Sequence, residues 1–278
     1  MRVGVLGLGR MGLPIARRLA PTFDVRVFDP AIATDLPTAT SALELAAAVD
    51  VLVTVLPGAA EVDDALPALL DNLKPAGLWL DLTSGDPRMT ERLAEGLDTV
   101  GAPMGGGPED AANGTLRFFV GGTDEAVDRA RPLLEVLGTL DQVGNGVGDG
   151  YTAKLLANLL WFGQAVAVTE ALLLGQARGI PPARLRTVLG SSAGGSRFID
   201  EYLDKLLGGD YLETFGLDRC VEELEILASL ARDEKVPFEL SETVARLHRE
   251  ALERFGAVDG ELLAAKLLEE RAGRHLRA

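Results

Sequence analysis

Cysteine and histidine are scarce in this chain of 278 residues. Its one cysteine, Cys220, cannot form an internal disulfide, which is the usage expected of a protein in the reducing cytoplasm. The two histidines, His248 and His275, lack metal-ligand spacing, and we expect both on the surfaces of charged C-terminal helices. The sequence therefore predicts no metal site.

Positive charge is also in deficit, with 27 Lys and Arg against 42 Asp and Glu and a formal net charge of −15. Nucleic acids and anionic membranes both require a basic patch, so neither is an expected partner. The N-terminus enters strand-like sequence directly, and we expect no signal peptide. The most apolar stretch, 155–174, is interrupted by Asn158, Gln164 and Glu170, which favours a helix buried in protein over one in lipid.

Apolar residues are plentiful, at 47% of the chain, and the length favours two domains. Short apolar runs alternate with amphipathic segments up to about Gly148, and helical patterns follow. This predicts an α/β fold: a Rossmann-type, doubly wound, mostly parallel sheet in residues 1–148, and an all-helical domain in 149–278. A long interdomain helix would join them.

The first 29 residues have the order of a dinucleotide-binding unit. A strand is predicted at Arg2–Leu6, the glycine turn Gly7–Gly12 follows, and a helix extends through Leu19. A second strand at Asp24–Phe28 ends at Asp29. This order is typical of a nicotinamide-dinucleotide site, in which a strand is followed by a G-x-G-x-x-G turn, a helix, a second strand and an acid.

Each part of this unit has an expected task. Gly7 permits the tight turn, Gly9 lets the backbone approach the pyrophosphate, and Gly12 lets the helix pack closely on the sheet, while the helix N-terminus offers N–H groups to the phosphates. Asp29 can accept hydrogen bonds from the adenosine ribose and repels a 2′-phosphate, which favours NAD over NADP. Arg10 could reach a phosphate or lie in solvent.

The strand and helix pattern then repeats through residue 143. In a parallel sheet, ligands bind beyond the carboxyl ends of the strands, and this rule brings several loops to one edge. The predicted strands are Val51–Leu56, Gly77–Leu82, Thr99–Ala102, Leu116–Val120 and Thr139–Val143. The predicted helices are Ala60–Leu73, one from Pro87 to about Glu95, and Asp124–Leu137 with a Thr123 cap.

A loop of three glycines, Gly105, Gly106 and Gly107, follows the predicted strand Thr99–Ala102. Its bare backbone N–H groups could hold a carboxylate or carbonyl oxygen. Taken alone, the loop is better explained as a flexible turn.

Gly148–Asn158 opens the long apolar helix, which should reach about Gly179. Lys154 and Asn158 share a helix face, and a lysine beside an amide suits proton transfer to a carbonyl oxygen. In isolation Lys154 would be read as a lysine extending from a buried helix towards solvent. Amphipathic helices are predicted after it, and their leucine-rich surfaces suggest a homodimer or larger homo-oligomer. They span Ala183–Leu189, Phe198–Leu207, Phe215–Asp233, Ser241–Phe255 and Glu261–Arg274.

Together these motifs resemble the β-hydroxyacid dehydrogenase family, which includes 3-hydroxyisobutyrate and tartronate-semialdehyde dehydrogenases. Gly7-Leu8-Gly9-Arg10-Met11-Gly12 is similar to the family's cofactor loop, Ala102–Gly107 to its substrate loop, and Gly148-x-Gly150-xxx-Lys154-xxx-Asn158 to its catalytic motif. Leu56, Pro57 and Ser84 fall where the family contacts the cofactor.

The resemblance implies an NAD(P)-dependent oxidoreductase acting on a small β-hydroxy acid or its semialdehyde. Lys154 would be the general base in oxidation and the general acid in reduction, with Asn158 holding the hydroxyl or the lysine in line. Substrate contacts would come from Gly105, Gly106 and Gly107.

Two positions depart from the family pattern. Gly105 replaces a serine whose hydroxyl would bind the substrate carboxylate, and Glu222-Glu223 replaces a Lys-Asp pair. The substrate therefore stays open, and Arg197 is a candidate for the missing positive charge, although an exposed arginine at a helix start is the simpler interpretation. An imine reductase fits the lost serine but not Lys154, and a nucleotide-binding regulator without catalysis fits Gly105 and Glu222. A 6-phosphogluconate dehydrogenase would need a longer helical domain.

Overall fold

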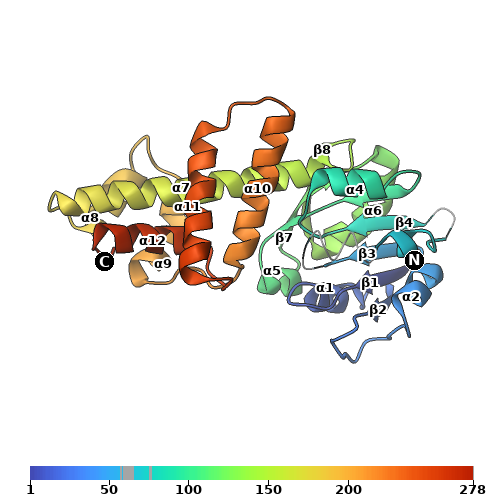
Figure 1. Cartoon of the computed structure of the whole chain (residues 1–278). Coiled ribbons are helices and arrows are strands. Elements are labelled where there is room, and N and C mark those ends of the chain that lie inside the picture. Colours follow the sequence, from blue (N-terminus) through green and yellow to red (C-terminus); the bar gives the residue numbers. More distant parts are fainter. Residues whose placement is uncertain (57, 59–65, 75–76, 278) are drawn as a thin grey trace. The chain divides into compact units, whose positions relative to one another are not determined.

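The computed structural model describes the whole chain except residues 57, 59–65, 75–76 and 278. It divides into two compact units, Met1–Lys154 and Leu155–Ala278 (Figure 1).

The first unit is built on a mostly parallel sheet, as the sequence predicts. Within the described residues, eight strands form the order β2-β1-β3-β4-β5-β7-β6, and β8 pairs with β7. Neighbours from β2 to β5 are parallel, whereas β7 is antiparallel to both β5 and β6. The strands are β1 (Arg2–Leu6), β2 (Asp24–Phe28), β3 (Val51–Thr54), β4 (Leu78–Asp81), β5 (Asp98–Gly101), β6 (Met104–Gly105), β7 (Leu116–Gly121) and β8 (Gly138–Gly144).

Helices cover both faces of this sheet, because alternate strand residues point to opposite sides. One core joins Val5 and Val53 to the buried faces of α1 (Gly12–Leu19), α5 (Pro108–Asn113) and α6 (Asp124–Leu137). A second core joins Leu52 and Trp79 to α2 (Ala42–Ala48), to helical residues at 66–70 and to Met89 of α4 (Pro87–Leu93). The sheet is therefore doubly wound, as predicted.

Local capping signals set several helix starts. The Thr123 hydroxyl accepts a hydrogen bond from the Ala126 N–H at 3.3 Å, and α6 has the predicted bounds. The Ser41 hydroxyl does the same for Glu44 at 3.1 Å and begins α2, which the sequence reading missed. Most of the first turns of the predicted helix Ala60–Leu73 lie outside the described residues.

The second unit is helical. The long helix α7 (Asp149–Ala177) passes through the boundary between the units. It is followed by α8 (Pro182–Gly190), a π-helical turn η1 (Phe198–Tyr202), α9 (Leu203–Gly208), α10 (Leu217–Asp233), α11 (Glu239–Phe255) and α12 (Leu263–Ala272). The predicted helix Phe198–Leu207 is therefore divided into η1 and α9. In η1, the rings of Phe198 and Tyr202 both pack edge-on against Trp161.

The prediction for His248 was wrong. Its side chain is 1% exposed inside α11, on the same face as Val244 and Ala251. The ring Nδ1 lies 2.9 Å from the Val244 carbonyl, and Nε2 has no hydrogen-bond partner among the described residues. The apolar neighbours at positions 244, 245, 247 and 251 were the signal that placed this face inside. His275 is exposed, as expected.

Helix α7 is long and apolar enough to cross a membrane, judged by length and composition alone. In the part of the chain that the structure describes, it is the single such helix, and one third of its apolar window is buried. Leu156, Leu160 and Leu174 are exposed along it. Much of its apolar surface is thus left uncovered within one copy of the chain.

Candidate active site

The glycine turn after β1 packs tightly at both ends and is open in the middle. Gly7 has φ +91°, and a Cβ there would lie 2.3 Å from the Val55 carbonyl oxygen. A Cβ on Gly12 would lie 1.9 Å from the Gly7 oxygen, so neither position accepts a side chain. A Cβ on Gly9 would meet no atom of the described residues within 4 Å. This bare, open stretch before α1 fits a dinucleotide pyrophosphate, whose phosphates bind helix N-termini and exposed backbone.

Asp29 is fixed beside that turn by three backbone N–H groups. Oδ2 accepts from Leu8 at 2.7 Å, and Oδ1 accepts from Ala31 at 2.8 Å and Ile32 at 3.0 Å. Each carboxylate oxygen has two acceptor positions, so one position on Oδ2 is left by these bonds for a ribose hydroxyl. The structure thus places the Asp29 carboxylate next to the Gly7–Gly12 turn.

The other predicted cofactor residues lie in three settings. The Leu8 side chain is buried in the core, while Met11 is half-buried at the start of α1 and Arg10 is exposed. The Leu56 N–H donates to the Thr83 hydroxyl at 3.1 Å, which ties the loop after β3 to the loop after β4 just before Ser84. Pro57 lies outside the described residues.

The triple-glycine loop is more structured than a flexible turn. Gly105 pairs with Arg117 in the β6–β7 ladder, and Gly106 has φ +114°. The Gly107 N–H donates to Asp110 Oδ2 at 2.8 Å at the start of α5, so one predicted donor is already engaged. A Cβ on Gly105 would meet only ordinary contacts, at 3.7 Å from Arg117 O and 3.8 Å from Phe119 Cε2. No contact with the described residues requires glycine at 105.

Lys154 lies in the second turn of α7, whose first turn rests on the carboxyl edge of the sheet. A Cβ on Gly150 would lie 2.3 Å from the Phe119 oxygen and 2.8 Å from the oxygen of Gly101, the last residue of β5. This backbone contact brings the helix start to the edge that also carries the Gly7–Gly12 turn and Asp29. The predicted base and the predicted cofactor loop therefore belong to one compact unit.

Asn158 is four residues further along α7. Its side-chain amide is held by Glu223, one of the two glutamates that replace the family's Lys-Asp pair. Asn158 Nδ2 donates to Glu223 Oε2 at 2.6 Å, and Glu223 is 5% exposed. The adjacent Glu222 pairs instead with Arg219 at 2.8 Å. The two glutamates that replace the family's Lys-Asp pair thus differ in role.

Arg197 forms an exposed ion pair with Glu201, at 2.8 Å and one helical turn away. That hydrogen bond is the main reason why the pKa of Arg197 is raised. The simpler interpretation of this arginine, a surface residue at a helix start, agrees with this contact.

The sequence reading missed a buried carboxylate at the end of β4. Asp81 is 1% exposed; Oδ1 accepts from the Thr54 hydroxyl at 2.6 Å and the Thr83 N–H at 3.0 Å, and Oδ2 accepts from the Tyr151 hydroxyl at 2.5 Å. Burial raises the pKa of Asp81, against the lowering effect of its donors, and burial and the nearby carboxylate raise the pKa of Tyr151. The sequence signal for this buried carboxylate was an aspartate inside the apolar run Leu78–Leu82.

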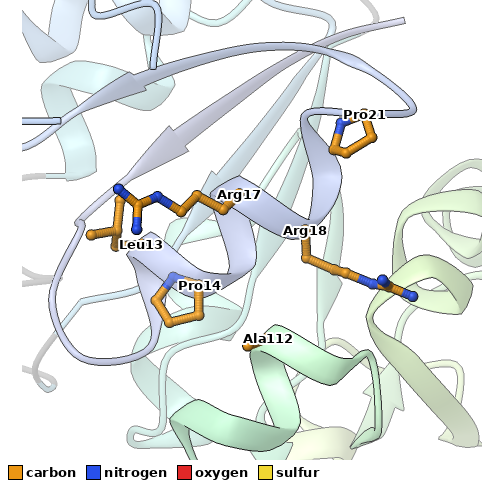
Figure 2. A pocket seen from close by; sticks show the side chains of 6 residues that line it. All are labelled: Leu13, Pro14, Arg17, Arg18, Pro21 and Ala112. Atoms are coloured by element: carbon orange, nitrogen blue, oxygen red, sulfur yellow. The ribbon is translucent and has the colours of Figure 1, made fainter. Parts of the chain in front are cut away.

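A shallow hollow of about 350 Å³ lies between α1 and α5 (Figure 2). Its arginines do not converge on a ligand: Figure 2 shows Arg17 and Arg18 extending in different directions, and they are bonded to Asp35 and to the Val136 carbonyl respectively. Among the described residues, its lining contains none of the predicted site residues. The lining residues are Leu13, Pro14, Arg17, Arg18, Pro21 and Ala112.

Family profiles match both parts of the chain. Residues 2–148 match the NAD binding domain of 6-phosphogluconate dehydrogenase, and residues 148–268 match the NAD-binding profile of NADP-dependent 3-hydroxyisobutyrate dehydrogenase. A 2-(hydroxymethyl)glutarate dehydrogenase of Eubacterium barkeri is 28% identical over 259 residues, covering 87% of this chain and 86% of the relative. An NAD-dependent L-serine dehydrogenase of Pseudomonas aeruginosa is 30% identical over 217 residues, covering 72% and 73%.

Solved structures share the fold over nearly the whole chain. The 3-hydroxyisobutyrate dehydrogenase of Mycobacterium tuberculosis with L-serine superposes with a TM-score of 0.87 at 24% identity, covering 96% of this chain and 98% of that one. An imine reductase of Myxococcus stipitatus reaches 0.64 at 18% identity, covering 96% and 99%. Both likenesses are ones of fold alone.

The cofactor turn, the lysine helix and these matches define a class of enzyme: oxidoreductases that use a nicotinamide dinucleotide. Within that class, the chain belongs to the β-hydroxyacid dehydrogenase family. The family, enzyme class and cofactor class predicted from the sequence are thereby confirmed, as is a small hydroxy acid or its carbonyl counterpart as the type of substrate.

Proposed function

We propose that this enzyme interconverts a small β-hydroxy acid and its semialdehyde, with Lys154 as general acid and base. The observation that carries the proposal is the contact of Gly150 with Gly101 and Phe119, because it fixes the start of α7 on the carboxyl edge of the nucleotide-binding sheet. One turn later the helix presents an amine on that unit. A cofactor turn and a proton-transfer group on one edge are what hydride and proton removal from a carbinol require.

In oxidation, the substrate carbinol loses a proton from oxygen and a hydride from carbon. Lys154 Nζ takes the proton, and in the reverse direction it returns the proton to the carbonyl oxygen. The dinucleotide, when bound, supplies the hydride acceptor or donor. The Gly7–Gly12 turn holds the pyrophosphate and Asp29 holds the adenosine ribose, so the chain's task there is binding and orientation.

Asn158 would position the lysine or the substrate hydroxyl. Its Nδ2 donates to Glu223 at 2.6 Å, which fixes the direction of the amide, and its Oδ1 is an acceptor by its chemistry. Because the buried Glu223 carboxylate accepts from the amide nitrogen, the Asn158 side chain cannot rotate freely, and proton transfer depends on such fixed geometry. Glu223 thus sets the direction of the Asn158 amide.

The proposed cofactor preference is NAD over NADP. Asp29 keeps its carboxylate beside the turn through three backbone N–H groups, and a 2′-phosphate at this position would meet a negative charge.

We place the enzyme in the cytoplasm as a homodimer or larger homo-oligomer, without nucleic-acid or membrane partners. The exposed leucines of α7, above all Leu160 and Leu174, support assembly, because a second copy would cover apolar surface that one copy leaves in water. This assignment accounts for the apolar length of α7 without a bilayer.

The test is a substrate panel followed at 340 nm. It combines 3-hydroxyisobutyrate, L-serine, 2-(hydroxymethyl)glutarate and the semialdehyde of 3-hydroxyisobutyrate with NAD(H) and with NADP(H). Turnover of at least one member, faster with NAD(H), is the expected result. Tight cofactor binding without turnover of any member would show that catalysis of this kind has been lost.

A second candidate function is reduction of a cyclic imine. The observation that favours it is Gly105, which offers no hydroxyl to a substrate carboxylate although the fold has room for one. Adding a five-membered cyclic imine and NADH or NADPH to the panel separates the two functions, because only the imine would then be reduced.

A further inference from the structure

The proposed mechanism makes no use of the buried carboxylate of Asp81. Among the described residues, the groups that donate to it come from Thr54, Thr83 and Tyr151, and all of them are uncharged. A carboxyl group removed from water without a cation is costly unless its hydrogen bonds are complete. Its placement at the end of β4 therefore needs an explanation beyond simple packing.

Its donors come from three parts of the sheet edge. Thr54 ends β3, where it pairs in register with Asp81 itself, and Thr83 lies in the loop after β4. The third donor, Tyr151, is 70 residues away in the first turn of α7 and is 1% exposed. Asp81 thus connects strands β3 and β4 to the helix that carries Lys154.

The backbone around Tyr151 is shaped for this connection. A Cβ on Gly101 would lie 2.4 Å from Tyr151 Cε2, and a Cβ on Gly121 would lie 2.4 Å from the Gly146 oxygen. Side chains at either position would push the helix start away from the sheet. The tyrosine ring therefore lies directly on the end of β5, and its hydroxyl reaches Asp81 on the neighbouring strand.

We infer that Asp81 and Tyr151 form a buried clamp that positions Lys154. The clamp fixes the first turn of α7 against the carboxyl edge of the sheet, and Lys154 is three residues beyond Tyr151, on the next turn of the same rigid element. Asp81 and Tyr151 are positioning residues, since they act through the helix and do not touch the reacting atoms. The catalytic part of this inference rests on the proposed role of Lys154; the clamp itself does not.

The direct test compares Tyr151→Phe with Tyr211→Phe. The second change is a matched control: Tyr211 also donates its hydroxyl to a buried carboxylate, Glu269 Oε2, at 2.5 Å, but in the helical unit. Each variant loses one hydroxyl and leaves one buried carboxylate with one donor fewer, so both are expected to lose stability, although Glu269 keeps its bonds from Leu276 and Arg277.

Amide hydrogen exchange of the peptide at 149–158 reports on the clamp. Tyr151→Phe should speed exchange there by about tenfold, the factor expected for loss of one hydrogen bond to a charged group, and Tyr211→Phe should leave it unchanged. The rate at which limiting acetic anhydride acetylates Lys154, divided by the rate for Lys235, should change by roughly threefold or more in Tyr151→Phe. The same ratio should stay unchanged in Tyr211→Phe. Unchanged exchange and acetylation in Tyr151→Phe would overturn the clamp.

Steady-state kinetics with the panel member turned over fastest report on positioning. Tyr151→Phe should lower kcat by roughly ten- to a hundredfold with the KM for NAD(H) nearly constant, because a displacement of about 1 Å at the acid–base group costs up to about a hundredfold. Faster exchange with an unaltered kcat would overturn the positioning role.

Asp81→Asn is a second variant at the same bond, and it keeps the inference testable if Tyr151→Phe fails to fold. Its amide can donate to the Tyr151 oxygen while its carbonyl keeps the other two bonds, so kcat and exchange should stay within about threefold of the parent. A loss as large as that of Tyr151→Phe would contradict the clamp. A parent enzyme inactive on the whole panel would refute the proposed function, and exchange and acetylation would still decide the clamp.

Discussion

At the scale of single residues, the proposed reaction depends on one amine. Lys154→Ala removes the group that exchanges a proton with the substrate oxygen, while the cofactor turn and Asp29 are untouched. We expect kcat to fall by roughly 10²–10⁴-fold, the usual contribution of general acid–base catalysis. NADH affinity, measured by fluorescence titration, should be nearly unchanged. A variant with parental turnover would remove Lys154 from the mechanism.

Gly105 offers a second prediction at this scale. Gly105→Ser introduces a hydroxyl where a Cβ meets only contacts of 3.7 Å and 3.8 Å, so the free energy of unfolding should stay within about 1 kcal/mol of the parent. A hydroxyl that bonds a carboxylate should lower the KM of a hydroxy acid by roughly tenfold and leave that of a cyclic imine unchanged.

Gly7→Ala is the contrasting control for this substitution. Its Cβ would lie 2.3 Å from the Val55 oxygen at a φ of +91°, so we expect a loss of roughly 2–4 kcal/mol in urea unfolding. A loss of similar size in Gly105→Ser would show that residue 105 is glycine for reasons of fold.

At the scale of elements, α11 carries a buried histidine whose ionisation opposes folding. Burial lowers the pKa of His248, and Nε2 has no partner among the described residues. The unfolded chain therefore binds the proton more readily than the folded one. Stability is complete above the unfolded pKa of about 6.5 and falls as the pH drops below it.

The prediction uses His248→Leu, with the exposed His275→Leu as its matched control. Between pH 7.5 and 5.5 the parent should lose roughly 1 kcal/mol more unfolding free energy than His248→Leu, since each pH unit is worth at most about 1.4 kcal/mol per proton. Urea unfolding at both pH values measures the difference. His275→Leu should follow the parent; equal slopes for all three proteins would contradict the burial argument.

Elements set by neighbouring residues were predictable from the sequence, whereas pairs distant in the chain were not. Thr123 fixes the start of α6 through a bond three residues away, and the glycine turn and Asp29 lie within 23 residues of one another. The Asp81–Tyr151 bond joins positions 70 apart, and Asn158–Glu223 joins positions 65 apart. Their partners become visible only after the sheet and the helices have packed.

At the scale of the whole molecule, the proposal concerns how many copies assemble. Leu160 and Leu174 are 64% and 68% exposed on α7, and a second copy that covers this helix would bury both. A charge introduced at the centre of such an interface would be desolvated and unpaired, which costs several kcal/mol of association free energy per copy. The double variant Leu160→Glu with Leu174→Glu should therefore dissociate the oligomer.

Light scattering coupled to size-exclusion chromatography measures this at a fixed protein concentration. The matched control is Leu240→Glu, because Leu240 is 79% exposed on α11 and carries the same change on a different helix. We expect the control to keep the parental mass and the α7 variant to elute with the mass of one chain. A parent that is itself monomeric at micromolar concentration would refute assembly through α7, and dissociation by Leu240→Glu alone would transfer the interface to α11.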